Sequence, residues 1–316
     1  MLCPPYYFSI YDGAGVFATK EETRGEKFRN TAIDKKRPAN YNGFMKKSVR
    51  IFLTVICSVA AAIAVATIVA FSIFKVNSAR MPEDFESAKS VKFIAHRGLS
   101  SVYYENSEQA FIAAAASDFF YGIETDVYFT ADGVAVCAHD DDAFTDSSVK
   151  ITGSNYADIK NLSLKENDYG YTSEAICTFE RYLEITAAGD KVAVIELKQP
   201  DLTKEQIQEL ISLSERICGD DFVMISFEAK HVKNVEKTNA DLVTQRLSNN
   251  VFTNWFAAMN GYNVSVAASS ASKYIVNLAH RRGREIGVWT VNSVEDMKKF
   301  VEMGVDYITT DFDFSA

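Results

Sequence analysis

Cysteine is scarce in this sequence and follows no pattern. The chain has 316 residues and five cysteines, and no two of them form a C-x-x-C pair. A structural zinc site or a disulfide scaffold would need paired cysteines at regular spacing. The sequence therefore predicts neither, and we expect the cysteines to behave as small apolar side chains.

Positive charge is also lacking over most of the chain. Residues 81–316 contain 21 Lys and Arg against 37 Asp and Glu. Proteins bind nucleic acid largely by neutralising its phosphates with Lys and Arg, and an anionic lipid surface repels an acidic protein surface. The balance of charge therefore argues against nucleic acid as a partner.

Charge is absent altogether from residues 51–74, which read "IFLTVICSVAAAIAVATIVAFSIF". A helix of this length, rising about 1.5 Å per residue, would extend roughly 36 Å and cross a hydrocarbon core of ~30 Å. Lys and Arg are more frequent before this run than after it, which places the N-terminus in the cytoplasm. A signal peptide beginning at Met45 is the alternative, but the run is longer than a signal core of ~7–15 residues, and we expect a retained anchor.

These features predict a single-pass protein of the cell membrane, divided into four parts. Residues 1–48 form a cytoplasmic tail that we expect to be disordered, and residues 49–75 form the anchor. Residues 76–90 are a juxtamembrane linker, and residues 91–316 form one folded domain outside the cytoplasm. No low-complexity segment interrupts this last part.

Short β-rich runs recur through the folded domain, mostly with helix-like segments between them. Several runs are almost wholly apolar, as expected of parallel strands that are covered on both faces. Regular alternation of strand and helix over this length predicts an α/β fold, a (β/α)8 TIM barrel. The runs are "KFIAH", "YGIETDVYF", "GVAVCAH", "KVAVIELK", "DFVMISF", "ADLVTQRL", "YNVSVAA", "REIGVWTV" and "VDYITT".

There are nine runs, one more than eight parallel strands require. The short connection between the second and third runs accounts for the additional one. Only the tetrapeptide Thr130–Gly133 separates the second run from the third. A parallel crossover needs about a dozen residues or more, whereas Asp-Gly is typical of hairpin turns. We therefore predict an antiparallel hairpin at strand 2. A turn centred in the tetrapeptide would place Asp126 opposite Cys137 and Glu124 opposite His139.

Polar residues gather at the C-terminal ends of the predicted strands, where barrel active sites lie. Glu124 and Asp126 are two residues apart and share one strand face, as do Glu196 and Lys198. The remaining strand ends carry His96, Arg97 and Gly98, His139 with Asp140, Ser226 with Phe227, Gln245, Trp289 with Asn292, and Asp311.

Together these residue types describe phosphodiester cleavage. Three carboxylates suit a hard divalent cation, Mg²⁺ or Ca²⁺, and Arg and Lys suit a phosphate beside it. Two histidines can accept and donate a proton near neutral pH. One strand carboxylate alone could equally form a salt bridge, so the prediction rests on the combination. The other two histidines, His231 and His280, stand among Lys or Arg in helix-like segments and are predicted to lie on the surface.

The ordered set of motifs resembles the glycerophosphodiester phosphodiesterase family. The resemblance covers residues 91–313, and the sequence departs from the family pattern at Tyr104, where proline is usual, and at Ser107, where threonine is usual. Neither departure touches the acid/base or carboxylate residues. The matching motifs are His96-Arg97-Gly98, Glu105-Asn106-Ser107, Glu124-Thr125-Asp126, Thr130-Ala131-Asp132-Gly133, His139-Asp140, Glu196-Leu197-Lys198, Trp289-Thr290-Val291-Asn292 and Thr310-Asp311.

The resemblance implies a role for each matched residue. Gly98 is expected to let the backbone approach the phosphate, because glycine has no Cβ. His96 and His139 are the expected acid/base pair. The other expected roles are a divalent cation, Ca²⁺ or Mg²⁺, on Glu124, Asp126 and Glu196, phosphate on Arg97 and Lys198, and substrate on Phe227, Trp289 and Asn106, with Asn106 also tying down its loop.

The expected reaction is metal-dependent hydrolysis of small glycerophosphodiesters to sn-glycerol 3-phosphate and an alcohol. One alternative is a phospholipase D- or C-like hydrolase acting on lysophospholipids or phosphoinositides, which the aromatic loops "SSVYYENS" and "SNNVFTNWFAAMNGYN" leave open. The other is a scaffold that binds phosphodiesters without cleaving them, and a complete set of acid, base and ligand residues argues against it.

Overall fold

The computed structural model describes residues 51–64, 66–67, 91–173 and 175–315, and the chain divides into two compact units, residues 1–68 and 69–316. In the first unit, residues 51–64 are helical. Among the described residues, no helix is both long and apolar enough to cross a bilayer. The predicted tail, the predicted linker and the rest of the predicted anchor fall almost entirely outside the described residues, so the anchor stays a prediction.

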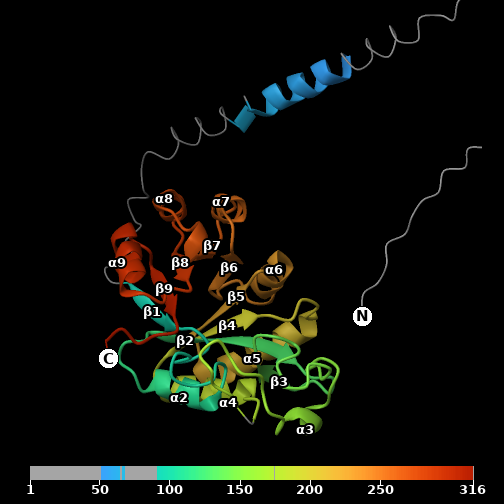
Figure 1. Cartoon of the computed structure of the whole chain (residues 1–316), viewed down its shortest axis with the longest axis vertical. Coiled ribbons are helices and arrows are strands. Elements are labelled where there is room, and N and C mark those ends of the chain that lie inside the picture. The colour runs from blue at the N-terminus through green and yellow to red at the C-terminus, as the bar shows by residue number, and fades with distance from the viewer. Residues whose placement is uncertain (1–50, 65, 68–90, 174, 316) are drawn as a thin grey trace, which may run out of the picture. The chain divides into compact units, whose positions relative to one another are not determined.

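The second unit contains eight parallel strands that close into a barrel (Figure 1). The strands follow the order β1-β9-β8-β7-β6-β5-β4-β2, and pairing of β1 with β2 closes the ring, as the predicted TIM barrel requires. The strands are β1 (Lys92–Ala95), β2 (Gly122–Phe129), β4 (Val192–Leu197), β5 (Phe222–Ser226), β6 (Thr244–Ser248), β7 (Asn263–Ala267), β8 (Ile286–Trp289) and β9 (Tyr307–Thr310).

Helices follow most strands and surround the barrel. Most begin at a Ser, Thr or Asn whose side chain accepts a hydrogen bond from a backbone N–H of the first turn, which satisfies one of the free donors there. The helices are α2 (Glu108–Ala115), α3 (Tyr156–Ile159), α4 (Phe179–Ala188), α5 (Lys204–Cys218), α6 (Ala229–Thr238), α7 (Val251–Met259), α8 (Lys273–Arg281) and α9 (Val294–Met303), with a 3₁₀ turn, η1, at Ala268–Ser270.

Helix α7 lies where the sequence suggested an aromatic loop. Asn250 caps it by accepting a hydrogen bond from the Thr253 backbone N–H at 3.0 Å. Its buried face is made of small and polar residues, Asn254, Ala257 and Ala258, whereas Phe252 and Phe256 are exposed. Most of the large apolar side chains of this helix therefore face away from the core. For this reason the sequence did not show the apolar face that usually identifies a helix.

Strand β3 (Ala135–Cys137) pairs antiparallel with the end of β2, beyond the residues that pair with β1. Val127, and not Asp126 as expected, is opposite Cys137. The shift arises because the loop has three residues: Thr130 N–H donates to the Val134 carbonyl at 2.9 Å, and Gly133 has a φ of 85°. Left-handed geometry at the third loop position is typical of such loops.

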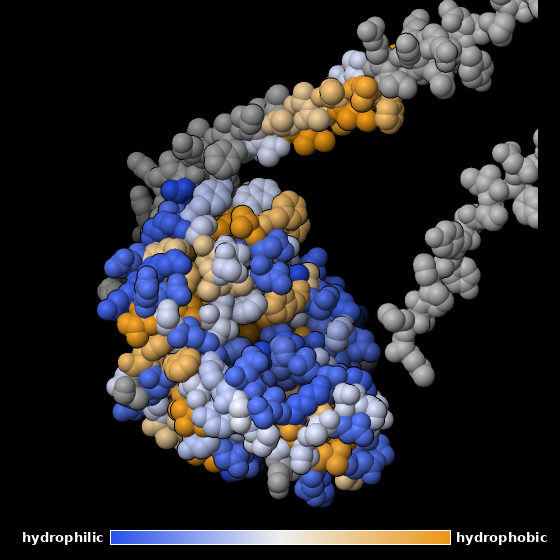
Figure 2. Space-filling view, viewed as in Figure 1, coloured by the Kyte–Doolittle hydropathy of each residue, from blue (hydrophilic) through white to orange (hydrophobic). Residues whose placement is uncertain are grey.

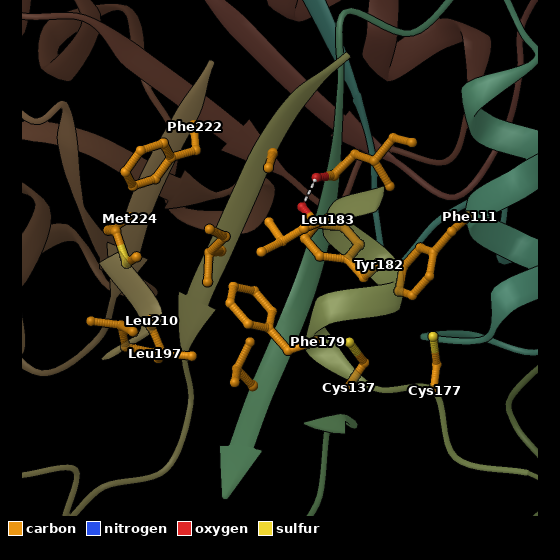
Figure 3. Close-up of a cluster of buried hydrophobic side chains, with 14 of the residues drawn as sticks. Phe111, Cys137, Cys177, Phe179, Tyr182, Leu183, Leu197, Leu210, Phe222 and Met224 are labelled. Atoms are coloured by element: carbon orange, nitrogen blue, oxygen red, sulfur yellow. Dashed lines mark hydrogen bonds between the residues drawn. The ribbon is translucent and has the colours of Figure 1, made fainter. Parts of the chain in front are cut away.

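The largest apolar core lies between the barrel and helices α2, α4 and α5 (Figure 3). Phe111, Phe179 and Tyr182 are fully buried there, and the Tyr182 hydroxyl donates a hydrogen bond to the Ile123 carbonyl at 2.7 Å. The second core involves α7, α8 and α9. A smaller cluster that includes Ile94, Val194 and Leu247 comes from the strands themselves.

Candidate active site

A cavity of about 140 Å³ is formed at the C-terminal ends of the strands. All of the predicted site residues line it except Asp126 and Asn106, which are buried and contact one another. The cavity is lined by His96, Arg97, Glu124, His139, Glu196, Lys198, Ile225, Phe227, Leu247, Ser265, Trp289 and Thr309.

Three carboxylates converge at this cavity. Glu124 and Asp126 come from β2, Glu196 comes from β4, and the strand register puts Asp126 beside Glu196. One oxygen of each group lies within 4.8 Å of the others, and all three residues are buried. The spacing of two residues puts Glu124 and Asp126 on one face of β2, and the register with β4 adds Glu196.

Burial and neighbouring charges shift the pKa values of all three carboxyls. Burial, reinforced by the charges of Asp126 and Glu196, raises the pKa of Glu124 well above its ordinary value. Burial, with the charge of Asp126, likewise raises the pKa of Glu196 to about 7. Burial also opposes ionisation of Asp126, but the charges of Arg97 and Lys198 outweigh it and lower the pKa of that carboxyl.

The donor set fits a divalent cation. Within the described part of the chain, Asp126 Oδ1 is buried and accepts no hydrogen bond, although Lys198 Nζ lies 3.2 Å from it as an ion pair. Buried carboxylate oxygens are the ligands that Ca²⁺ and Mg²⁺ prefer. A cation among the three groups would occupy the free oxygen and offset the repulsion between them.

Arg97 joins the strand end to the carboxylates by both its backbone and its side chain. Its φ is 58°, and its backbone N–H donates to Glu124 Oε2 at 2.9 Å. Its guanidinium donates to Glu105 Oε1 at 2.9 Å and lies 3.2 Å from Asp126 Oδ2. Arg97 therefore fixes the direction of both β2 carboxylates while keeping its charge beside the cavity.

Gly98 packs against helix α2, and its expected approach to a phosphate stays a prediction. Its φ is 81°, and a Cβ added to it would lie 2.6 Å from the backbone carbonyl carbon of Ala110 in helix α2. Glycine is therefore required for close packing of the β1 turn against α2.

Asn106 lies against Asp126. Its side-chain amide donates to Asp126 Oδ2 at 3.0 Å, and its Oδ1 accepts from the Thr125 hydroxyl at 2.8 Å. Its backbone N–H donates to the Arg97 carbonyl at 2.9 Å. The structure thus supports the predicted tying of the loop and shows Asn106 orienting a carboxylate.

His96 is held by a hydrogen-bonded carboxylate. Its Nδ1 lies 2.7 Å from Asp311 Oδ1, which also accepts from the Ser100 hydroxyl at 3.0 Å. The other oxygen, Oδ2, accepts from the Tyr169 hydroxyl at 2.8 Å and from the Asn292 amide. Burial of Asp311 opposes ionisation, but the bond and charge of His96 and the other donors lower its pKa to about 2. This contact orients the His96 ring through Nδ1.

His139 follows β3 and is more accessible. Its side chain is 33% exposed, and its Nδ1 lies 3.2 Å from Asp140 Oδ2. Phe227 and Trp289 form an apolar wall of the same cavity, with ring centroids 5.6 Å apart in an edge-to-face arrangement. The Trp289 indole N–H donates to the Ser265 carbonyl at 3.1 Å, which fixes the ring.

Sequence reasoning misplaced two histidines and missed one tyrosine. His231 and His280, predicted on the surface, are 0% and 5% exposed. His280 Nε2 pairs with Asp306 at 2.9 Å, and His231 Nδ1 lies 3.4 Å from the Ser226 hydroxyl. Their Lys and Arg neighbours occupy the outer faces of the same helices. Tyr169 stands in an irregular segment, and nothing local in the sequence connects it with the strand-end residue Asp311.

Comparison with known proteins decides the family. The model of the glycerophosphoryl diester phosphodiesterase family matches residues 96–313. The chain belongs to this family. As a glycerophosphoryl diester phosphodiesterase family member it is an enzyme, a phosphoric diester hydrolase.

Relatives of this family member match the whole barrel domain. A glycerophosphodiester phosphodiesterase of Bacillus altitudinis is 27% identical over 237 residues, which cover 70% of this chain and 94% of the relative. A crystal structure of a glycerophosphodiester phosphodiesterase from Parabacteroides distasonis has a TM-score of 0.56 at 25% identity, covering 70% of this chain and 92% of that one. An Oleispira antarctica phosphodiesterase, solved with its product sn-glycerol-3-phosphate, has a TM-score of 0.58 at 19% identity, covering 70% and 92%.

Proposed function

We propose that this phosphodiesterase hydrolyses glycerophosphodiesters to sn-glycerol 3-phosphate and an alcohol, with a divalent cation, Ca²⁺ or Mg²⁺, at the carboxylates. One observation carries the proposal: three carboxylate oxygens lie within 4.8 Å of one another beside a cavity lined by His96, His139, Arg97 and Lys198. The product bound in the Oleispira antarctica phosphodiesterase, sn-glycerol-3-phosphate, is the one proposed here.

Glu124, Asp126 and Glu196 would hold the cation. When bound there, a divalent cation supplies positive charge that polarises a phosphoryl oxygen and eases deprotonation of a nucleophile. Arg97 and Lys198 offer fixed positive charge beside the carboxylates, which suits the two unesterified oxygens of a phosphodiester.

The two histidines move the protons. His96, oriented through Nδ1 by Asp311, removes the proton from the attacking hydroxyl, which belongs to water or to the glycerol itself. His139 donates a proton to the departing alcohol. General acid or base catalysis of this kind typically contributes about 10²- to 10⁴-fold. Phe227 and Trp289 exclude water from the apolar side of the cavity, where they contact the glycerol carbons.

The proposal is tested with the purified full-length chain and three substrates, each assayed with Ca²⁺, with Mg²⁺ and with EDTA. We expect glycerophosphocholine to yield sn-glycerol 3-phosphate and choline only when a cation is present. Preferential hydrolysis of lysophosphatidylcholine or phosphatidylinositol would favour the phospholipase alternative instead. Exposed Phe252 and Phe256 on α7 are the observation that keeps this alternative in the assay. Binding without turnover of any substrate would identify a scaffold.

We also propose that the enzyme is a single-pass protein of the cell membrane, with residues 91–316 outside the cytoplasm. The uncharged run at residues 51–74 and its basic N-terminal flank support this orientation. Protease added to intact cells, or to spheroplasts where an outer membrane is present, should digest loops of the barrel. Complete protection until the cells are lysed would reverse the orientation.

A further inference from the structure

Helix α7 presents an apolar face on the outside of the barrel, and none of its residues lines the catalytic cavity. Val251, Phe252 and Phe256 are 63%, 70% and 55% exposed. The half-buried Trp255 lies among them, with its ring centroid 6.4 Å from that of Phe252. Spacings of three and four residues place these four side chains on one side of the helix, which we call the α7 face. Hydrophobic surface over α7 is seen in Figure 2.

The segment that forms this side of the barrel is basic, although the folded domain as a whole is strongly acidic. Residues 242–284 contain five Lys or Arg and no Asp or Glu. Three of the five, Arg281, Arg282 and Arg284, stand together at the end of α8. The Arg282 guanidinium donates a hydrogen bond to the sulfur of Met259, the last residue of α7, at 3.7 Å. Positive charge therefore borders the α7 face.

These arginines are available to an external partner. Arg282 and Arg284 are exposed, and among the residues that the structure describes none of the three forms an ion pair. The acidic residue next to them in sequence, Glu285, instead accepts a hydrogen bond from the Tyr307 hydroxyl at 2.8 Å. The acidic residues that would repel an anionic surface thus lie outside the segment that carries the α7 face.

Aromatic rings beside unpaired arginines match the surface of a membrane that contains anionic lipids. Phe and Trp side chains lie favourably at the boundary between headgroups and acyl chains, and arginines are attracted to anionic headgroups. A second copy of the chain fits less well, because a symmetric contact would bring the same positive charges together. The local excess of basic residues therefore favours a lipid surface as the occupant.

The sequence also limits how far the barrel can be from a membrane. Residues 75–91 join the uncharged run to β1, and at about 3.6 Å per residue they extend no more than roughly 60 Å. With the anchor proposed above, the barrel stays within this distance of the bilayer. Docking is then an intramolecular step, for which a small contact area suffices.

We propose that the α7 face docks on the surface of a membrane that contains anionic lipids, with its aromatic rings at the level of the headgroups and the arginines at the end of α8 against the lipid phosphates. The proposal concerns a site apart from the catalytic cavity, and it uses the proposed anchor only to keep the two surfaces close. Because α7 packs beside β6 and β7 on the outside of the barrel, docking leaves the cavity at the strand ends open to water-soluble substrates.

Tryptophan fluorescence can report this contact, because the chain contains only two tryptophans, Trp255 on the α7 face and Trp289 in the catalytic cavity. The full-length chain is reconstituted in phosphatidylcholine vesicles with brominated acyl chains, with or without phosphatidylglycerol. Bromine quenches an indole that lies close to it in the bilayer. The signal of Trp289 is obtained from the variant Trp255→Phe and subtracted.

We expect Trp255 to be quenched in vesicles that contain phosphatidylglycerol, and to be quenched less in neutral vesicles or at high salt, which screens exposed charges. The variant Arg282→Gln/Arg284→Gln should lower the docking equilibrium constant by roughly tenfold or more, since each basic residue near an anionic surface strengthens binding about fivefold. The variant Phe252→Ser/Phe256→Ser should lower quenching of Trp255 in both kinds of vesicle.

Two control variants remove similar side chains from other parts of the domain. Ile112→Ser/Leu162→Ser removes two exposed apolar side chains, and Lys160→Gln/Lys204→Gln removes two exposed positive charges, all outside the α7 face. Both controls should keep the wild-type quenching. All four double variants should keep the wild-type circular dichroism spectrum, which shows that they are folded.

Absence of Trp255 quenching in the wild type would overturn the docking, as would equal quenching of the wild type and Arg282→Gln/Arg284→Gln in phosphatidylglycerol vesicles. A dimer in detergent, detected by sedimentation and lost in Phe252→Ser/Phe256→Ser, would assign the α7 face to a second copy instead. A chain that does not float with neutral vesicles, yet shows Trp255 quenching in anionic ones, would refute the proposed anchor and support the docking.

Discussion

Replacing Asp311 with asparagine tests what the negative charge beside His96 contributes. The substitution keeps the size of the side chain but turns one acceptor oxygen into a donor. In the structure both oxygens of Asp311 accept, from His96 and Ser100 on one side and from Tyr169 and Asn292 on the other. An amide nitrogen cannot accept a hydrogen bond, so one pair of donors must lose its partner.

The size of the effect follows from the pKa of Asp311. Burial would raise it, yet the bond and charge of His96, with the other donors, lower it from 3.8 to about 2. At about 1.4 kcal/mol for each pH unit, the shift corresponds to roughly 2 kcal/mol of stability at neutral pH. Because the folded pKa is depressed, this contribution is complete above about pH 4 and is lost as the pH falls towards 2.

Urea unfolding of the wild type and of Asp311→Asn at several pH values measures this difference. We expect the variant to be less stable by roughly 2 kcal/mol at neutral pH, with the gap narrowing below about pH 4. Its kcat/KM should fall by about tenfold or more, because His96 loses its orientation. Asp118→Asn, which removes the same charge from an exposed position, is the control. A stability difference that does not change with pH would refute the assigned electrostatic origin.

Three further substitutions test other parts of the site. Glu124→Gln should lose activity and cation affinity together, measured by calorimetric titration with Ca²⁺; normal turnover in EDTA would show that the carboxylates are not the metal site. His139→Ala should lose most of its activity on glycerophosphocholine but keep most of it on a nitrophenyl phosphodiester, whose nitrophenolate leaves without a proton. His96→Ala should lose most of its activity on both substrates. The reversed pattern would exchange the two roles. Gly98→Ala should lower stability by about 2–5 kcal/mol in thermal or urea unfolding, since its Cβ would lie 2.6 Å from Ala110 at a φ of 81°; a wild-type melting temperature would contradict this.

The barrel and the position of its carboxylates could be predicted because both depend on short-range patterns. Apolar runs mark parallel strands, and polar residues at their ends must meet, since all the strands end at one rim. Because Glu124 and Asp126 are two residues apart, they lie on the same face of their strand. This is why His96 and Glu196 line the same cavity at the strand ends, although 100 residues separate them in sequence.

The features that escaped prediction depend on contacts between distant residues or on one backbone angle. The bond between Tyr169 and Asp311 joins residues 142 apart, and no periodic pattern indicates it. The register of β2 and β3 is set by the left-handed Gly133, which lengthens the loop by one residue. Helix α7 was obscured because it turns Phe252 and Phe256 outward, so that its sequence reads as an aromatic loop.

The lining of the active-site cavity at the C-terminal ends of the strands is divided along the chain. Every ionisable residue in it comes from the first half of the barrel, before β5, and the second half supplies only uncharged side chains. The two large apolar cores follow a similar division, so a substitution in one core need not disturb the packing of the other. Over evolutionary time these uncharged lining positions can therefore change the shape offered to a substrate, while Asp311, also from the second half, keeps its bond to His96. Directed evolution for new substrates should begin there, at Ile225, Phe227, Leu247, Ser265, Trp289 and Thr309.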